Sequence, residues 1–310
     1  MFSALKKHHR PSGRIGLSYS KDQLAIAHVD SLGSERPQLR GLKLATAVGT
    51  AEARQILASW IDERGLQGCS VAAVLDRSDY EVALVEAPEV QPQELREAVR
   101  WRMRGAVEMQ IDDAVIDVFP MPKRVSGASA PSVYAVAARR SAVERITAAA
   151  DVRDMLDAID IPELVLRNLV HLAAPEPRGC VALVLERSHA HVAVTALGTL
   201  YLLRRFELQK PLSAENGLDI DVPGLTLEMQ RSLDYYESHF DRPAPLELIV
   251  VPRTARAQLL ARTLASETSL RIRVLDINDA LLVAEPLTDE QQVAGMLAIG
   301  AALRVAGHAS

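Results

Sequence analysis

The sequence predicts an α/β protein built from two similar halves. Val181–Phe206 shows alternating apolar residues that predict three strands joined by two turns. Near the N-terminus, Ile15–Leu17 and Leu24–Val29 flank the polar turn Ser18–Gln23, a shorter version of the same pattern. The length of 310 residues exceeds the ~250–300 residues at which a single hydrophobic core stops growing. Each half is therefore expected to carry its own sheet.

The composition is that of an ordinary folded protein. Hydrophobic residues make up 48% of the chain and charged residues 24%, which argues against a disordered polar chain. The net charge of −5 argues against non-specific nucleic-acid binding, and aromatic residues, at 4%, are too few for a base-stacking platform. We therefore expect no nucleic-acid partner.

The two cysteines and the N-terminus bear on the cellular compartment. Cys69 and Cys180 lack metal-ligand spacing and are expected to be buried free thiols in a reducing environment. No apolar run approaches the ~20 residues that span a bilayer, and Met1–Arg10 lacks the hydrophobic region of a signal peptide. We expect a cytoplasmic protein whose basic Met1–Arg10 is a solvated tail, with contact to an anionic membrane surface as the alternative.

The first half is predicted to combine a sheet with a covering helix. Arg14–Val29 forms the first strand pair, and Thr50 is expected to cap a helix over Ala51–Arg64. Ser70–Leu75 and Tyr80–Val85 are predicted to be further strands.

A change of composition after Val85 indicates an inserted small α+β subdomain at residues 86–140. Gln93–Arg104 is predicted to be a charged amphipathic helix, and Ala114–Phe119 and Tyr134–Ala138 are predicted strands. Ser141–Ala158 is then predicted to be one helix that returns to the first half.

The boundary between the halves is predicted at Pro175–Gly179, PEPRG. The second half is predicted to contain helices at Gly224–His239, Thr254–Thr268 and Gln291–Val305. The resulting division is 1–85 for the first domain, 86–140 for the inserted subdomain, 141–174 for the return to the first domain and 175–310 for the second domain.

The most informative segment is Leu227–Phe240, LEMQRSLDYYESHF. Its apolar residues form one stripe at helical spacing, and it resembles the E-x-x-R-S-x-x-Y-Y helix of the PilM/MshI family. Glu86–Phe119, Met296–Arg304 and Ile15–Val29 are similar to further family segments in the same order. The family consists of actin-like proteins of type IV pilus assembly, and the MshI relatives serve the MSHA (mannose-sensitive haemagglutinin) pilus.

This resemblance implies an actin-like ATPase fold of two RNase-H-like domains, with a nucleotide cleft between them and a small subdomain in the first. ATP-binding members hold phosphate and magnesium at two D-x-G turns and adenosine at a Gly-Gly turn. Here Ser18 and Ser20 occupy the first pair of positions, and Leu185 and Arg187 occupy the second. At the third, Pro252 and Arg253 replace the glycines.

These replacements predict a pseudo-ATPase. Side chains at the glycine positions, and a proline without an N–H, prevent the close backbone approach that phosphate binding requires. We expect no catalytic residue, no metal and no cofactor, although weak nucleotide binding stays open. Two alternatives invoke ATP and magnesium: an active PilM-like ATPase of the same machinery, and an actin-fold small-molecule kinase.

The resemblance also implies a partner. Family members bind the N-terminal cytoplasmic peptide of a PilN-like inner-membrane protein, which recruits them to the membrane platform of pilus assembly. An extended peptide can add to a sheet edge or lie between that sheet and the Gln93–Arg104 helix. Leu95, Trp101, Val118 and Phe119 are the expected lining residues, with a role in the subdomain core as the alternative.

Other groups of polar residues are weaker candidates. His189 and His191 share one face of a strand but lack an evident third ligand in the sequence. Ser188 beside His189 lacks the G-x-S-x-G context of a nucleophile. Two acidic groups, Asp112-Asp113 with Asp117 and Asp219-Ile-Asp221, are expected to be solvated turns rather than cation sites.

Overall fold

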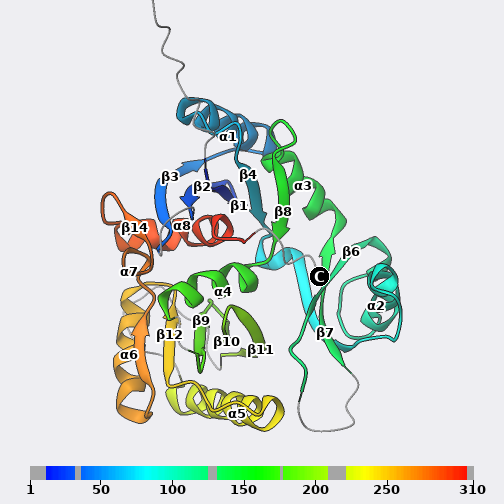
Figure 1. Cartoon of the computed structure of the whole chain (residues 1–310), viewed down its shortest axis with the longest axis vertical. Coiled ribbons are helices and arrows are strands. Elements are labelled where there is room, and N and C mark those ends of the chain that lie inside the picture. The colour runs from blue at the N-terminus through cyan, green and yellow to red at the C-terminus, as the bar shows by residue number, and fades with distance from the viewer. Residues whose placement is uncertain (1–11, 32–35, 125–130, 175–176, 209–220, 306–310) are drawn as a thin grey trace, which may run out of the picture.

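The computed structural model describes residues 12–31, 36–124, 131–174, 177–208 and 221–305 (Figure 1). The basic Met1–Arg10 segment and Asp219 lie outside these residues. Within them, no helix combines the length and the apolar character that a membrane crossing requires.

The first sheet has the strand order β14-β3-β2-β1-β4-β8. β1 pairs antiparallel with β2, and β2 with β3, whereas β1 and β4, and β4 and β8, run parallel. The strands are β1 Arg14–Ser20, β2 Gln23–Asp30, β3 Gln38–Thr46, β4 Ser70–Val74, β8 Leu156–Asp160 and β14 Leu282–Val283.

The second sheet repeats this arrangement in the order β11-β10-β9-β12-β13, again with two antiparallel pairs followed by two parallel pairs. Without β14, the two sheets therefore match strand for strand, which confirms the predicted duplication. The strands are β9 Cys180–Leu185, β10 His189–Ala196, β11 Thr199–Glu207, β12 Glu247–Val251 and β13 Arg271–Val274.

A third, smaller sheet has the order β5-β7-β6 and carries one helix. We call this unit the small subdomain. It consists of β5 Tyr80–Glu86, α2 Leu95–Met103, β6 Ala114–Pro120 and β7 Ser132–Arg139. It corresponds to the inserted α+β segment that the sequence predicts.

The helices and sheets form five layers (Figure 1). α1 and α3 cover the outer face of the first sheet, α8 and α4 lie between the two sheets, and α5 and α6 cover the outer face of the second. The helices are α1 Thr50–Arg64, α3 Arg140–Ala150, α4 Pro162–Ala173, α5 Val222–Phe240, α6 Ala255–Glu267, α7 Ile277–Ala280 and α8 Asp289–Ala302.

Two helix predictions need correction. α1 begins at Thr50 and follows Gly49, so Thr50 does not act as its N-cap. The helix predicted over Ser141–Ala158 ends at Ala150, because Arg153 and Asp154 form a turn with positive φ angles of 54° and 57°. The residues beyond that turn form β8, the edge strand of the first sheet beside β4.

The C-terminal segment belongs spatially with the first sheet. The sequence division assigns residues 175–310 to the second domain, but β14 pairs with β3, and α8 packs on β1, β2 and β4. This close packing is possible because β1 carries glycine at position 16. A Cβ there would collide with the Ala298 carbonyl oxygen and would lie 2.6 Å from the Ala302 nitrogen.

Gly16→Ala should therefore lower the free energy of unfolding by about 3 kcal/mol, because the colliding atoms are helix backbone and cannot rotate away. Urea denaturation measures this change. Gly295→Ala is the matched control in the same contact: its Cβ would meet side-chain methyl groups rather than backbone, those of Leu42 at 2.8 and 2.9 Å and that of Ile299 at 3.4 Å. It should cost about 1 kcal/mol or less. Equal losses in both variants would contradict this packing argument.

Candidate functional site

The candidate site is the cleft where strand ends of the two sheets face each other across α4. The three positions at which the sequence predicts degenerate nucleotide loops all follow strands of these sheets: β1, β9 and β12. Arg77, just beyond β4, and Glu186, just beyond β9, line the same cavity, so the strand ends of both sheets meet there.

The first loop is a two-residue hairpin turn. Ser20 pairs with Gln23, and the intervening Lys21 and Asp22 adopt positive φ angles of 47° and 64°. Ser18 lies inside β1, where it pairs with β2 and β4. Lys21 and Asp22 are exposed in this turn.

Ser20 instead binds within the chain. Its hydroxyl donates to Asp76, which follows β4, and Asp76 also accepts from the Ser78 N–H at 2.9 Å and the Ser78 hydroxyl at 2.6 Å. Burial works to raise the pKa of Asp76, but the hydrogen bonds from Ser20 and Ser78 outweigh it and hold the pKa below its ordinary value. The Ser20 hydroxyl, at the predicted phosphate position, is thus already engaged in a hydrogen bond to Asp76.

The second loop, between β9 and β10, places one carboxylate in the cleft. Leu185 is buried, and Arg187 is exposed and forms no ion pair with any described residue. Between them, a Glu186 oxygen lies 3.1 Å from Nε2 of the buried His191. Burial works to raise the pKa of Glu186, but His191 and the neighbouring arginines lower it below its ordinary value. A carboxylate therefore lies between the two positions of the second predicted loop.

Arg77 reaches into the cleft from the first sheet. Its Nε lies 3.5 Å from a Glu163 oxygen at the start of α4, and its guanidinium stacks on the Tyr80 ring at 4.8 Å. The Tyr80 hydroxyl donates to the other Glu163 oxygen at 2.5 Å. Burial and the adjacent Glu163 carboxylate raise the pKa of Tyr80 well above its ordinary value, so the hydroxyl remains a donor.

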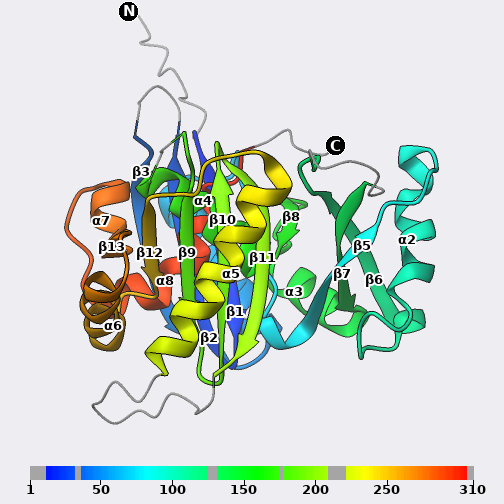
Figure 2. The same cartoon turned by 90° about the horizontal axis from the view of Figure 1, so that it is seen from below.

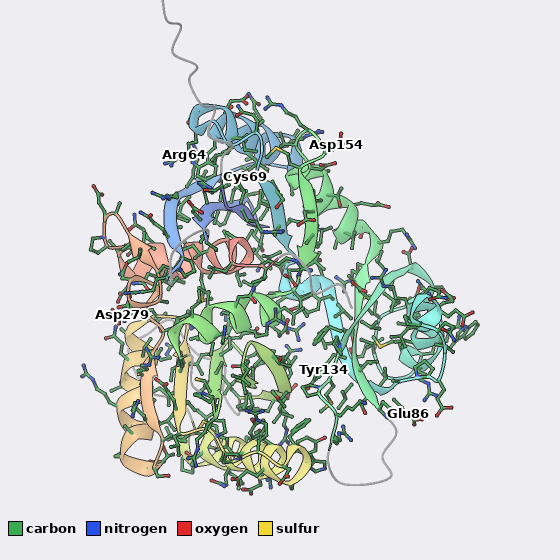
Figure 3. The ribbon with its side chains drawn as sticks, in the orientation of Figure 1. Arg64, Cys69, Glu86, Tyr134, Asp154 and Asp279 are labelled. Carbon is green, nitrogen blue, oxygen red and sulfur yellow. The ribbon has the colours of Figure 1, made fainter. Side chains whose placement is uncertain are left out.

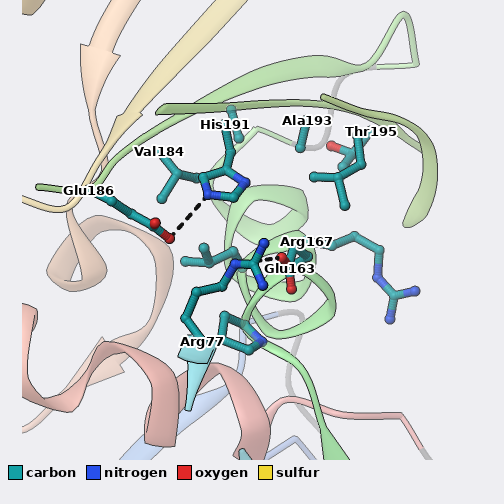
Figure 4. A pocket seen from close by; sticks show the side chains of 12 residues that line it. Arg77, Glu163, Arg167, Val184, Glu186, His191, Ala193 and Thr195 are labelled. Atoms are coloured by element: carbon teal, nitrogen blue, oxygen red, sulfur yellow. Dashed lines mark ion pairs between the residues drawn. The ribbon is translucent and has the colours of Figure 1, made fainter. Parts of the chain in front are cut away.

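These groups line a cavity between α4 and the second sheet, with an empty volume of about 420 Å³ including its mouth (Figure 4). Its charged lining consists of Arg77, Arg167, Glu163 and Glu186, two positive and two negative, so these four charges cancel. A magnesium-bound triphosphate would meet two carboxylates rather than a positive site.

The third loop joins the second sheet to the central helix layer. Arg253 follows β12, and its guanidinium lies 3.1 Å from Asp276 and 2.6 Å from Asp289. Asp289 begins α8, which packs on the first sheet. Pro252, which directly precedes Arg253, has no backbone N–H. Where the related nucleotide sites have glycines, this chain has an ion pair that connects the halves.

The cysteines are not reactive groups. Both are free and buried, as the sequence predicts. Burial raises the pKa of Cys180 to about 12, and it also raises the pKa of Cys69, which is labelled in Figure 3. Neither thiol is a nucleophile at neutral pH.

The histidines and the acidic turn have local partners. His191 pairs with Glu186, and His189 lies 3.8 Å from Glu207, so carboxylates that the sequence did not indicate lie near both. No group of three or more potential metal-binding side chains occurs among the described residues. The acidic residues near β6 face arginines instead: Asp112 pairs with Arg104, Asp113 with Arg140, and Asp117 with Arg96.

The four predicted partner-binding residues do not form one surface. Leu95 and Val118 pack in the small core between α2 and its sheet. Trp101, on the same helix, is 61% exposed, with Arg104 stacked over its ring at 4.3 Å. Phe119 follows Val118 in β6 and therefore points to the opposite face, where it stacks on Tyr134 with ring centroids 5.1 Å apart. Phe119 is separated from the other three by the sheet.

Comparison with solved structures identifies this fold. A chain of the PilM–PilN type IV pilus biogenesis complex aligns with a TM-score of 0.65 at 19% identity, over 95% of this chain and 98% of that chain. A Bacteroides thetaiotaomicron protein with an actin-like ATPase fold has a TM-score of 0.49 at 10% identity, over 92% and 96%. The cytoplasmic domain of EpsL, from the type II secretion system of Vibrio cholerae, has 0.45 at 12%, over 94% and 94%.

No protein-family model and no curated protein sequence matches the chain. At 19% identity, the likeness to the pilus complex establishes the fold alone. Combined with the repeated strand order, it establishes the actin-like ATPase fold, with two RNase-H-like units and an inserted small subdomain.

Ser20→Ala should raise the pKa of Asp76, because it removes a hydrogen bond that stabilises the carboxylate. Since the folded pKa of Asp76 is depressed, ionised Asp76 stabilises the native protein at neutral pH. This contribution is lost as the pH falls through the folded pKa, so the variant should lose less stability on acidification. Carboxyl NMR titration measures the midpoint. Ser18→Ala, which removes no hydrogen bond to Asp76, should leave the titration midpoint of Asp76 unchanged. A midpoint in Ser20→Ala equal to that of the parent protein would contradict the role given to the Ser20 hydrogen bond.

Proposed function

We propose that this protein is a non-catalytic, cytoplasmic actin-like scaffold of type IV pilus biogenesis, of the MSHA type. Its role is to bind the N-terminal cytoplasmic segment of a PilN-like inner-membrane protein and so join the assembly platform. It associates with the inner membrane only through that partner. The main support comes from the three positions that bind nucleotide in the related ATPases. In this chain Ser20 and Arg253 contact other side chains, and Arg187 is exposed and forms no ion pair with a described residue.

The absence of turnover is inferred from the charges in the cleft. Ser20 hydrogen-bonds to Asp76, Glu186 faces His191, and Arg253 pairs with two aspartates. A bound nucleotide would have to break these contacts and place phosphate near Glu163 and Glu186. Neither a metal-binding group nor a positively charged wall offsets that repulsion among the described residues.

The pilus assignment rests on two separate likenesses. The segments quoted above resemble the PilM/MshI family in sequence, and the fold aligns with a chain of the PilM–PilN complex over 95% of this chain. The MSHA type rests on the sequence resemblance alone.

The exposed side of α2 is the partner surface that we favour. Trp101 presents a large aromatic ring to solvent beside Arg104, and β6 is an edge strand of the small sheet. An extended segment can add to such an edge while one apolar side chain contacts the ring. Leu95 and Val118 support this surface from the core beneath it, whereas Phe119 belongs to the opposite face.

Titration with Mg-ATP separates this proposal from an ATP-binding PilM-like ATPase. We expect no heat of binding at high micromolar nucleotide in isothermal titration calorimetry, because side chains at the glycine positions and Pro252 keep phosphate away from the loop backbone. Tight binding would overturn the pseudo-ATPase proposal and favour the ATPase alternative.

Trp101→Ala should weaken binding of a synthetic PilN-like N-terminal peptide by roughly 30-fold, the effect typical of an aromatic hot spot. Fluorescence anisotropy of the labelled peptide measures this change. Leu197→Ala is the matched control, since Leu197 is 63% exposed but lies in the β10–β11 turn of the second half. A similar loss in both variants, or none in Trp101→Ala, would place the partner elsewhere.

A further inference from the structure

The small sheet has two faces with different neighbours. One face packs on α2 through alternate residues of β6, among them Ile116 and Val118. The other face carries Phe119 and Tyr134 and is turned toward the second half of the molecule (Figure 2). Because adjacent strand residues point to opposite faces, β6 contributes to both contacts.

The second face is built into the core of the other half. Tyr134 is 2% exposed and Met121 is 7% exposed, and both belong to the apolar cluster formed mainly by β9, β10, α5 and α6. Figure 3 shows Tyr134 where the small subdomain faces the second half. Two side chains of the first half are thus buried among residues of the second, although 47 positions (Tyr134 to Val181) to 143 positions (Met121 to Leu264) separate them in the chain.

A directed contact accompanies this burial. The Leu203 N–H donates to the Tyr134 hydroxyl at 3.0 Å. Leu203 lies in β11, the edge strand of the second sheet, so the hydroxyl satisfies a backbone group that an open edge would leave to solvent. Burial raises the pKa of Tyr134 to about 12, so the hydroxyl stays neutral at physiological pH.

A third contact lies nearby. The guanidinium of Arg124, just beyond β6, lies 5.9 Å from the centre of the Tyr235 ring on α5. Elsewhere in the molecule, Arg253 connects the end of β12 to Asp289 on α8. In addition to the α4 and α8 layer that packs between the two sheets, side chains join the two halves at these two separate places.

We propose that the small subdomain is a latch, that is, a contact that keeps the two halves closed without a bound nucleotide. Phe119, Met121 and Tyr134 attach the subdomain to β11 and α5. The Arg253–Asp289 pair acts together with them. The cleft then keeps one conformation whether or not a nucleotide is present. This proposal stands independently of the partner, since it concerns only contacts between the halves.

Spin labels on the two halves test the latch. Val48 and Leu246 are 75% and 57% exposed, one in each half, and both native cysteines are buried, so cysteines at these positions can be labelled selectively. Double electron–electron resonance should give one narrow distance for the labelled protein, unchanged by Mg-ATP. Tyr134→Ala should lengthen or broaden that distance.

A gentler variant covers the case in which Tyr134→Ala fails to fold. Tyr134→Phe removes only the hydroxyl, and hydrogen exchange at the Leu203 amide should accelerate by about 2- to 10-fold, as expected for one lost hydrogen bond. Trp101→Ala, on the other side of the same subdomain, should change neither the distance nor the exchange.

Two results would overturn the proposal. One is a broad distance in the labelled protein that narrows when Mg-ATP is added, which would mean that nucleotide closes the cleft. The other is a Tyr134→Phe variant whose Leu203 amide exchanges as slowly as in the parent protein.

Discussion

The close packing of α8 and α4 between the two sheets is the constraint on which the rest of the structure depends. Gly16 lets the α8 backbone approach β1, and Gly300 lets α8 approach α4, where a Cβ would lie 2.8 Å from the Val165 carbonyl oxygen. Because neither contact can loosen without losing buried area, the two sheets stay at a short distance from each other. That distance brings Arg77, at the end of one sheet, into the cavity with Glu186 at the end of the other.

The chemistry of the cleft follows from this approach. Positions that would cradle phosphate in an actin-like ATPase hold hydrogen bonds and ion pairs of the chain itself, from Ser20 to Asp76 and from Arg253 to Asp289. Half-buried ion pairs add little to stability in isolation, but they give each charged group a partner and leave no excess positive charge for a polyphosphate. In this cleft the charged side chains pair with one another, whereas Trp101 on α2 is exposed to solvent.

Strongly periodic segments allowed most of the fold to be predicted, whereas β8 depended on a contact distant in sequence and the face of Phe119 on strand alternation. The three strands of Val181–Phe206 and the long helix ending at Phe240 follow from apolar spacing alone, because one buried face dictates that spacing. β8 was missed because its five residues continue an alanine-rich helical pattern, and only pairing with β4 makes them a strand. Phe119 was grouped with Val118 as a partner residue, although the pleat of β6 sends it to the other face.

The sequence by itself determined the α/β class, the duplication and the inserted subdomain. These depend on local periodicity and on the chemistry of single residues. The tertiary structure alone decided that the C-terminal helix joins the first sheet, that Glu186 meets His191, and that Tyr134 satisfies the edge of β11. Such contacts join residues up to hundreds of positions apart, and they form only because burying apolar surface brings separate layers together.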